Sequence, residues 1–583
     1  MKPIIDPRDG DLEDDASSTK RRSMLSLAGS LLAEISLPKL ALSWIILFLF
    51  PGLLLGLTPL VASAWVSIVS GKIASPLAGI WPTIILLILI AAGLFGARAL
   101  FRIAENSFWS LNSIAVEPVY TVCREGMRHI AEKLIRSRLS DSRLARLRAL
   151  TALLAGVVVV GASATFLLMV WPNSRWVGSL ADLASPRELA LVALANSLVI
   201  VAAYLAVAAA VWAIADATMP QLHDVDTFAA DSHKGRMWRI VHLSDIHIVG
   251  ERYGFRIESG RSGPRGNDRL GRVFALLDAI HAEKPLDAIL ITGDVTDAGR
   301  AAEWSEFSKL LKEYPSLAER VLILPGNHDL NIVDRANPAR LDLPTSPNRK
   351  LRRLRFLSVT EALLGERACV IDRAKGCVAG HLSEAIDSHR EEMRRFADVG
   401  RPRFSTAMNE LWASAFPMVL PPDQDDGLGI VLLNSNADTH FSFTNALGMI
   451  SAEQVRGIEI AAAQYPKAYW LIALHHHVIE YPRPAKVLSE RIGTALVNGN
   501  WFVRRLRFLG GRAILMHGHR HLDWIGECAQ LFIVSAPSPI IEATNNVDTY
   551  FYIHTLAVQD DRRICLLPPE RITVSGQAED VLG

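Results

Sequence analysis

Five short motifs in this 583-residue chain place Asp, Asn and His side chains directly after apolar runs. Each apolar run, such as Ile240 to Leu243, predicts a buried strand. Because ligands bind beyond the carboxyl ends of strands in open α/β sheets, we expect the motifs to meet at one edge. The motifs are Asp245-Ile-His247, Gly293-Asp294-Val-Thr-Asp297, Gly326-Asn327-His328-Asp329, His475-His476-His477 and Gly518-His519-Arg520-His521.

The side chains of these motifs indicate a metal site. Carboxylate, amide and imidazole donors without a thiolate suit two borderline or hard cations, such as manganese, iron or zinc. One carboxylate must bridge the ions if they lie about 3.5–4 Å apart, as two-metal hydrolases require. Singly, each residue is better explained as a loop cap or a core histidine, but together they predict metal binding. The candidate ligands are Asp245, His247, Asp294, Asn327, His475, His519 and His521.

Residues beside the candidate ligands have more than one interpretation. Asp297 and Asp329 are expected to orient a ligand or His328, with plain turn caps as the alternative. His476 and His477 are expected to pack or hydrogen-bond rather than bind a metal. A basic cluster further along is either a grip on a phosphorylated or membrane-surface substrate or a solvated helix face. That cluster consists of Arg349, Lys350, Arg352, Arg353 and Arg355.

The motifs, taken in order, resemble those of the calcineurin-like metallophosphoesterase family over roughly residues 237–560. The order is Asp-x-His, Gly-Asp-x-x-Asp, Gly-Asn-His-Asp, His and Gly-His-x-His. The stretch from Leu433 to Ser435, followed by Gly448 to Gln454, is similar to the class III cyclic-nucleotide phosphodiesterase branch. The sequence departs from that branch at Asn434, where Asp is usual, and at His477 and Val478, which replace prolines.

The resemblance implies a four-layer α/β/β/α sandwich and a division of the ligands between two divalent transition metal ions. Asp294 would bridge the ions, and His328 would stabilise the phosphoryl oxygens and donate a proton to the leaving oxygen. The nucleophile would be a metal-bound hydroxide, because the cations lower the pKa of water. One ion would be held by Asp245, His247 and His521, and the other by Asn327, His475 and His519.

Apolar residues make up 50% of the chain and concentrate before about residue 215. Four segments are long enough to cross a hydrocarbon core of about 30 Å and predict transmembrane helices. The alternative is a buried helical core, but four nearly uncharged spans exceed what a globular core uses. The segments are roughly 40–69, 77–97, 150–171 and 189–214.

The composition divides the chain into a polar N-terminal tail, a membrane domain, a linker and a catalytic domain. Strands and helices alternate in the catalytic domain, which predicts a layered α/β fold. This rhythm is interrupted over about 331–429, which we interpret as an inserted helical cap. The four parts span 1–38, 39–214, 215–236 and 237–583.

The distribution of basic residues predicts how the chain crosses the membrane. The stretch 98–149 is rich in arginine, whereas the links 70–76 and 172–188 carry few basic residues. The positive-inside rule therefore places this stretch, both termini and the catalytic domain in the cytoplasm. Five scattered cysteines fit a reducing compartment. We expect an integral protein of a bacterial inner membrane.

The sequence thus predicts a membrane-anchored, metal-dependent phosphoester hydrolase, and more specifically a phosphodiesterase. The alternatives are a phosphomonoesterase and a membrane sensor whose domain binds a nucleotide without turnover. The intact ligand set and His328 argue against the sensor. The expected partners are a phosphorylated small-molecule or membrane-surface substrate and the lipid bilayer. A net charge of +1 gives no signal of specific nucleic-acid binding, and nothing in the sequence indicates an oligomeric state.

Overall fold

The structure is a computed structural model, and the chain divides into two compact units. The helical unit is Ser36–Met219, and the α/β unit combines Met1–Ile35 with Pro220–Gly583. The described residues are 3–5, 41–42, 45, 49–74, 84, 119–135, 141–220, 222–229, 236–251, 255–257, 261–262, 265–333, 342, 347–400, 405–439, 442–481, 496–540 and 547–576.

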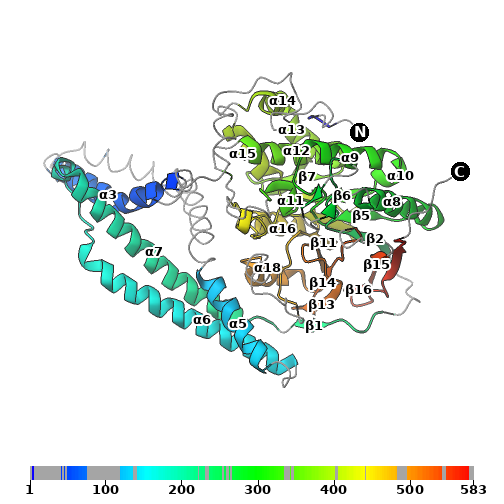
Figure 1. The fold of residues 1–583 in the computed structure, drawn as a ribbon, viewed down its shortest axis with the longest axis horizontal. Coiled ribbons are helices and arrows are strands. Elements are labelled where there is room, and N and C mark those ends of the chain that lie inside the picture. The colour runs from blue at the N-terminus through cyan, green and yellow to red at the C-terminus, as the bar shows by residue number, and fades with distance from the viewer. Residues whose placement is uncertain are drawn as a thin grey trace. The chain divides into compact units, whose positions relative to one another are not determined.

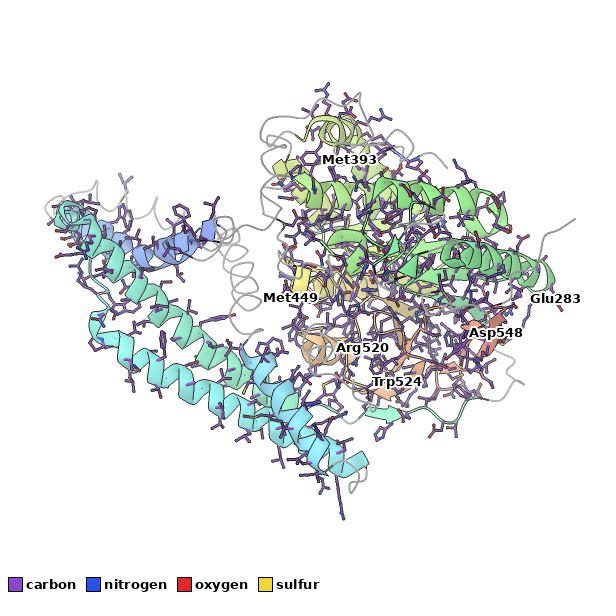
Figure 2. The ribbon with its side chains drawn as sticks, viewed as in Figure 1. Glu283, Met393, Met449, Arg520, Trp524 and Asp548 are labelled. Carbon is purple, nitrogen blue, oxygen red and sulfur yellow. The ribbon has the colours of Figure 1, made fainter. Side chains whose placement is uncertain are left out.

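Within the described part of the helical unit, three helices are long and apolar enough to cross a membrane. Side chains project outward along α6 and α7 (Figure 2), and large apolar ones such as Leu168 are 72% exposed. The predicted segment 77–97 lies outside the described residues apart from residue 84. The three helices are α3 (Phe50–Ala74), α6 (Asp141–Val170) and α7 (Pro186–Ala217).

Small and polar residues join these helices. A Cβ atom at Gly56 of α3 would lie 1.6 Å from the carbonyl oxygen of Ala193 in α7, so the two backbones approach closely. The buried Asn196 side chain donates to the carbonyls of Gly56 and Arg175 at 3.1 and 2.7 Å. Its polar atoms are therefore satisfied within the unit, as an apolar environment demands.

Two sheets form the centre of the α/β unit (Figure 1). The six-stranded sheet has the order β16 (Ile564–Leu566), β15 (Thr549–Val558), β2 (Met237–Leu243), β5 (Ala288–Ile291) and β6 (Val321–Ile323), with β17 (Glu570–Val574) paired to β15. The nine-stranded sheet has the order β1 (Leu222–Asp224), β13 (Trp524–Cys528), β14 (Leu531–Ser535), β12 (Ala513–His517), β11 (Tyr469–Ala473), β10 (Leu428–Leu432), β9 (Met418–Leu420), β7 (Cys369–Asp372) and β8 (Cys377–His381).

The central strands run parallel and are buried on both faces. In β5 and β11 every residue is buried, which requires a layer on each side of each sheet. One contiguous core contains side chains from both sheets and from α8 (Arg265–Glu283), α9 (Ala301–Lys312) and α12 (Pro347–Leu364). The predicted α/β sandwich is therefore confirmed.

The segment 331–429 is more than a helical cap. It contains the expected helices α12, α13 (Leu382–Asp387), α14 (Arg390–Val399) and α15 (Ser405–Ala415). It also contributes β7, β8 and β9, which extend the nine-stranded sheet and were not predicted. These strands have three to five residues, too few to show a periodicity in the sequence.

Two further stretches have more structure than the sequence indicates. The expected linker 215–236 contains β1, which pairs antiparallel with β13. Residues Ile4 and Ile5, within the expected polar tail, are buried in the core of the α/β unit. The amide of Ile5 donates to the Ser358 hydroxyl of α12 at 2.8 Å. The chain near its N-terminus therefore packs on the same unit as the metal-site motifs.

A buried carboxyl group, that of Glu303, lies in the first turn of α9 and makes the stability of this unit depend on pH. Glu303 accepts hydrogen bonds from the amides of Ala298 and Arg300 at 3.0 Å each. Burial raises the pKa of Glu303 to about 7, above its ordinary 4.5. Its contribution to stability is therefore fully present below pH 4.5 and is lost as the pH rises through about 7.

We expect Glu303→Gln, which removes this ionisation, to gain stability relative to the wild type as the pH rises from about 5 to 8. The gain should be on the order of 3 kcal/mol. The melting temperature of the full chain in detergent, measured across this pH range, provides the test. Glu313→Gln changes an exposed carboxylate at the other end of α9 and serves as the control. A Glu303→Gln profile parallel to that of the wild type would contradict the assignment.

Candidate metal centre

The five motifs follow the carboxyl ends of β2, β5, β6, β11 and β12, and the structure brings their side chains together. Arg520 and Trp524, which lie on either side of His521 in the sequence, mark this neighbourhood in Figure 2. Two groups of candidate ligands have donor atoms within 4.8 Å of one another. These groups are Asp245, His247 and His521, and Asp294, His475 and His519.

The Asp294 carboxylate lies between the two groups. Its Oδ2 atom is 3.6 Å from Nε2 of His247 and 3.3 Å from Nε2 of His475. The amide oxygen of Asn327 lies 3.0 Å from the same His475 nitrogen. All seven predicted ligands therefore converge on one region, with Asp294 at its centre. Their assignment to particular ions remains a prediction.

The backbone at the ligands has an uncommon conformation. Eight non-glycine residues in the described part of the chain have positive φ angles, and five of them are candidate ligands. L-residues adopt this left-handed region rarely, and such positions concentrate at functional sites. The five are Asp245 (55°), His247 (48°), Asp294 (50°), His519 (75°) and His521 (51°).

Two glycines of the motifs are required because other residues lie too close to leave room for a side chain. A Cβ atom at Gly326 would lie 2.1 Å from both the amide nitrogen and Oδ1 of Asp294. A Cβ atom at Gly518 would lie 1.7 Å from the Ser244 hydroxyl and 2.7 Å from Oδ2 of Asp245. Any side chain at either position would displace a candidate ligand, so these glycines fix the spacing of the site.

Two candidate ligands are contacted through Nδ1 of their imidazoles, which leaves Nε2 facing Asp294. Nδ1 of His475 lies 2.8 Å from the Thr292 carbonyl, which directs Nε2 toward Asp294. Nδ1 of His247 is 3.4 Å from Oδ1 of Asp297, as expected for that aspartate. Sequence reasoning missed Thr292, because a backbone carbonyl leaves no mark in a motif.

The electrostatics of the site favour metal-binding protonation states at Asp294 and His519 but not at His475. Burial opposes the charge on Asp294, but the imidazoles of His475 and His328 hold the pKa of its carboxyl far below the usual range. Burial, together with the neighbouring His476 and His475, lowers the pKa of His519 well below its ordinary value. An ionised carboxylate and a neutral imidazole are the forms that bind metals. Burial opposes the charge on His475, but the Asp294 carboxylate raises its pKa to about 9, so this imidazole must lose a proton when it binds a metal.

His328 is buried beside the ligands and held at two points. Its amide donates to Oδ1 of Asp294 at 2.8 Å, and its Nδ1 lies 2.8 Å from the carbonyl of Asp297. Its ring packs edge-on against that of His247, with centroids 4.4 Å apart. Since a carbonyl only accepts, Nδ1 must carry a hydrogen, and Nε2 is the nitrogen that exchanges a proton.

The other flanking residues divide between the two interpretations. The Asp329 carboxylate accepts hydrogen bonds from the amides of Gly326 and Thr296 at 2.9 Å each, so it ties two motif loops together as a cap. His476 hydrogen-bonds with the Ser435 hydroxyl at 2.8 Å, and His477 stacks on Tyr481. These two histidines pack and hydrogen-bond, as expected.

The basic cluster on α12 is not a solvated helix face. Arg349, Arg352 and Arg355 are between 3% and 9% exposed. Arg349 and Arg353 pair with Asp438, and Arg352 pairs with Asp342. The sequence did not predict the burial of these arginines, because arginine normally lies at the surface.

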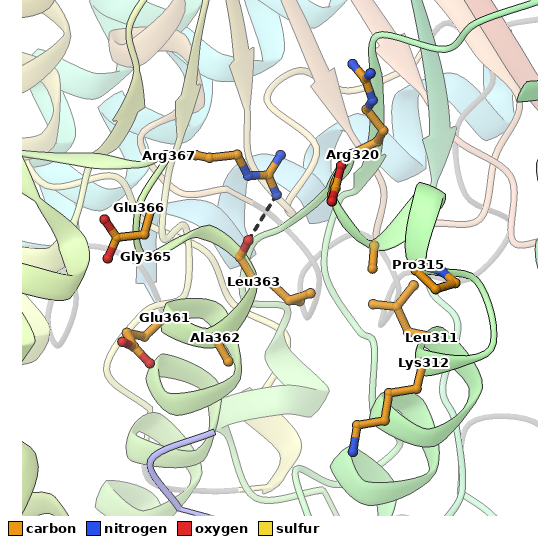
Figure 3. Close-up of a pocket in the computed structure, with 12 residues that line it drawn as sticks. Leu311, Lys312, Pro315, Arg320, Glu361, Ala362, Leu363, Gly365, Glu366 and Arg367 are labelled. Carbon is orange, nitrogen blue, oxygen red and sulfur yellow. Dashed lines mark hydrogen bonds between the residues drawn. The ribbon is translucent and has the colours of Figure 1, made fainter. Parts of the chain in front are cut away.

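A cavity of about 660 Å³ lies among the ends of α9, α10 (Pro315–Ala318) and α12 (Figure 3). Arg367 lies at its wall and donates to the carbonyls of Val321 and Leu363 at 2.9 and 3.0 Å. None of its lining residues is a candidate ligand. The strand-end cluster, rather than this cavity, is therefore the chemically defined site.

The residues present fit two divalent cations. Nε2 of His519 is buried, and among the described residues it has no hydrogen-bond partner. A buried donor or acceptor without a partner is costly unless something else satisfies it, and a metal ion would do so. The donors are carboxylate, amide and imidazole, and they match the borderline and hard ions predicted from the sequence.

The stretch that carries the five motifs matches a known family. Residues 239–523 match the family model of the calcineurin-like phosphoesterases. A "probable cyclic nucleotide phosphodiesterase" of Coxiella burnetii is 26% identical over 129 residues, which cover 22% of this chain and 47% of that protein. The chain thus matches about half the length of this relative. A "putative 5'-nucleotidase" structure from Staphylococcus aureus superposes with a TM-score of 0.32 at 12% identity, covering 60% of this chain and 56% of that one.

The fold, the site and the family match together define the class. The chain contains a calcineurin-like phosphoesterase domain. A domain of this class is a metal-dependent phosphoester hydrolase. The resemblance to calcineurin-like phosphoesterases seen in the sequence is therefore confirmed.

We expect Asp294→Ala to lose bound metal, because the variant lacks the carboxylate that belongs to one ligand group and contacts the other. After loading the full chain with Mn²⁺ and removing the excess, elemental analysis should find much less metal than in the wild type. Mn²⁺ should raise the melting temperature of the wild type but not of the variant, since only a bound ligand stabilises the folded state. Asp561→Ala, on an exposed turn, is the control. Undiminished metal in Asp294→Ala would refute the central position of this carboxylate.

Proposed function

We propose that the α/β unit hydrolyses phosphodiesters with the help of two divalent cations. The observation that carries this proposal is the position of Asp294. One oxygen of its carboxylate contacts His247 and His475, which belong to different ligand groups, and the other accepts the amide of His328. The residue that would donate the proton is thus held through its backbone amide at the carboxylate that would join the two ions.

The residues of the chain would act as follows. The candidate ligands would hold the ions, which polarise the phosphoryl group and lower the pKa of a water molecule. His328 would donate a proton from Nε2 to the leaving oxygen. The Asp297 carbonyl keeps the hydrogen on Nδ1, so the ring has one defined tautomer. Burial of His328, at 5% exposure, limits competing water around the proton donor.

The preference for a diester rests on similarity to a described phosphodiesterase. The matched stretch of the Coxiella protein belongs to a protein described as a cyclic nucleotide phosphodiesterase. At Asn434 the side chain accepts from Asn436, whose amide donates to the Pro325 carbonyl at 2.9 Å. Asn434 thereby supports the loop that carries Asn327 without needing a charge. The natural substrate would be a phosphorylated small molecule or a membrane-surface phosphoester.

We expect the Mn²⁺-loaded wild type to hydrolyse bis(p-nitrophenyl) phosphate faster than p-nitrophenyl phosphate. His328→Ala should keep its metal and lose about 10²–10⁴-fold in kcat toward methyl phenyl phosphate, whose poor leaving group needs the proton of a general acid. Rates and metal content of the two proteins are compared under the same loading. Preferred cleavage of the monoester would indicate a phosphomonoesterase, and metal binding without turnover of either compound would indicate a sensor. Loss of metal in His328→Ala would refute the assigned role.

We further propose that the helical unit anchors the chain in a bacterial inner membrane with the α/β unit on the cytoplasmic side. The three long apolar helices support this, as does the arginine-rich stretch 98–149. The packing of Ile4 and Ile5 on the α/β unit adds a separate argument. Segments that pack together must lie on one side, so the chain between them must cross an even number of times.

This parity requires a further crossing besides α3, α6 and α7, and the predicted span 77–97 would supply it. We therefore expect a reporter fused after Asp182, in the link between α6 and α7, to be outside. A reporter at the C-terminus should be inside. Alkaline phosphatase and fluorescent-protein fusions report the two sides. An external C-terminus would contradict the proposed topology.

A further inference from the structure

Two buried arginines of α12 contact the loops that carry His328. Nε of Arg352 donates to the carbonyl of Leu330 at 2.9 Å, and Nη1 of Arg355 donates to the carbonyl of Gly299 at 2.8 Å. Their side chains are 4% and 3% exposed. Since α12 belongs to the segment that interrupts the strand rhythm, neither arginine was part of a motif.

Each of these two carbonyls lies two residues further along the chain than a residue that determines the position of His328. Leu330 follows His328 itself, while Gly299 follows Asp297, whose carbonyl holds Nδ1 of the imidazole. The amides on either side of Gly299 are bound by Glu303. The Asp297 loop is therefore held from both sides, by a carboxylate at the amides and a guanidinium at the carbonyl.

The packing leaves little room for these loops to move. Gly299 has a φ of +67°, and a Cβ atom there would lie 2.4 Å from the Asp329 carbonyl and 2.8 Å from Cδ of Arg352. The arginine stem thus fills the space that the glycine leaves. A buried guanidinium is expensive to desolvate, and an apolar side chain of similar volume often stabilises a fold equally well. An apolar side chain could not donate to the two loop carbonyls, and Arg352 additionally pairs with Asp342.

We propose that Arg355 and Arg352 are positioning residues for His328. They hold the Asp297 carbonyl and the backbone after His328, so that Nε2 stays aligned with the leaving oxygen. This inference rests on the proposed hydrolysis. In that reaction water adds its oxygen to phosphorus, and the P–O bond breaks with its electron pair on the leaving oxygen. That oxygen takes the Nε2 proton, and the proton released by the water restores the imidazolium.

The dependence on the leaving group distinguishes positioning from a general structural effect. A general acid matters for a poor leaving group and little for p-nitrophenolate, which leaves without a proton. In the full Mn²⁺-loaded chain, we expect Arg355→Met to lower kcat for methyl phenyl phosphate about 10-fold or more. For methyl p-nitrophenyl phosphate the loss should stay below about 3-fold, with KM and metal content unchanged.

Three further variants complete the test. Arg355→Lys should recover part of the rate, since an ammonium group also donates to a carbonyl. Arg352→Met, which acts on the other side of His328, should show the same dependence on the leaving group. In a His328→Ala background, Arg355→Met should have no further effect on kcat, as expected for residues that act through one group. Arg395→Met, an exposed arginine of α14 paired with Glu391, is the control.

Equal losses on both substrates, or losses that add to that of His328→Ala, would overturn the proposal. So would losses that follow the metal content. If Arg355→Met does not fold, the Arg352→Met and Arg355→Lys results decide between the same outcomes. A wild type that cleaves neither compound would instead refute the proposed function. The two failures are therefore distinguishable.

Discussion

The site depends on how the Asp294 carboxylate is shared. Its two oxygens contact imidazoles from different strand ends and the amide of His328, and all of these groups are buried. A buried carboxylate of this kind is stable only where nearby positive or hydrogen-bonding groups surround it. The backbone of Gly326 lies so close that a Cβ atom there would clash with it. Moving any one of the contributing loops would therefore disturb the others.

The two packed sheets make this crowding possible. Five candidate ligands have left-handed backbone conformations, each of which costs about 1–3 kcal/mol unless the surroundings impose it. The strands that precede them are buried on both faces and belong to one core that joins both sheets. Asp329 then links the loop after β5 to the loop after β6 through backbone amides. The extended core offsets the local strain. The loops that carry the candidate ligands are rigid because they are attached to strands of this core.

Sequence reasoning identified what is periodic or chemically distinctive. The strands preceding the motifs followed from apolar patterns, and Ile240 to Leu243 are buried as expected. The seven candidate ligands converge because parallel strands of both packed sheets, β2, β5 and β6 in one and β11 and β12 in the other, end in the same region. The strands β7 to β9, the edge strand β1 and the docking of Ile4 and Ile5 could not be predicted, since short extended segments owe their structure to distant partners. The burial of the α12 arginines was missed for a related reason, because their partners are backbone carbonyls and remote carboxylates.

The left-handed backbone at the ligands also shapes which sequences this site can tolerate. Asparagine and glycine adopt that conformation with little strain, whereas valine, isoleucine and threonine do not. A neutral replacement such as Asp245→Asn would remove a charge but keep the turn, whereas Asp245→Val would affect both the charge and the turn. In a saturation mutagenesis survey, every substitution at these positions should lower activity, and β-branched residues should lower it further because they also strain the backbone. Ligand positions that lack positive φ, such as Asn327 and His475, should show only the first of these losses.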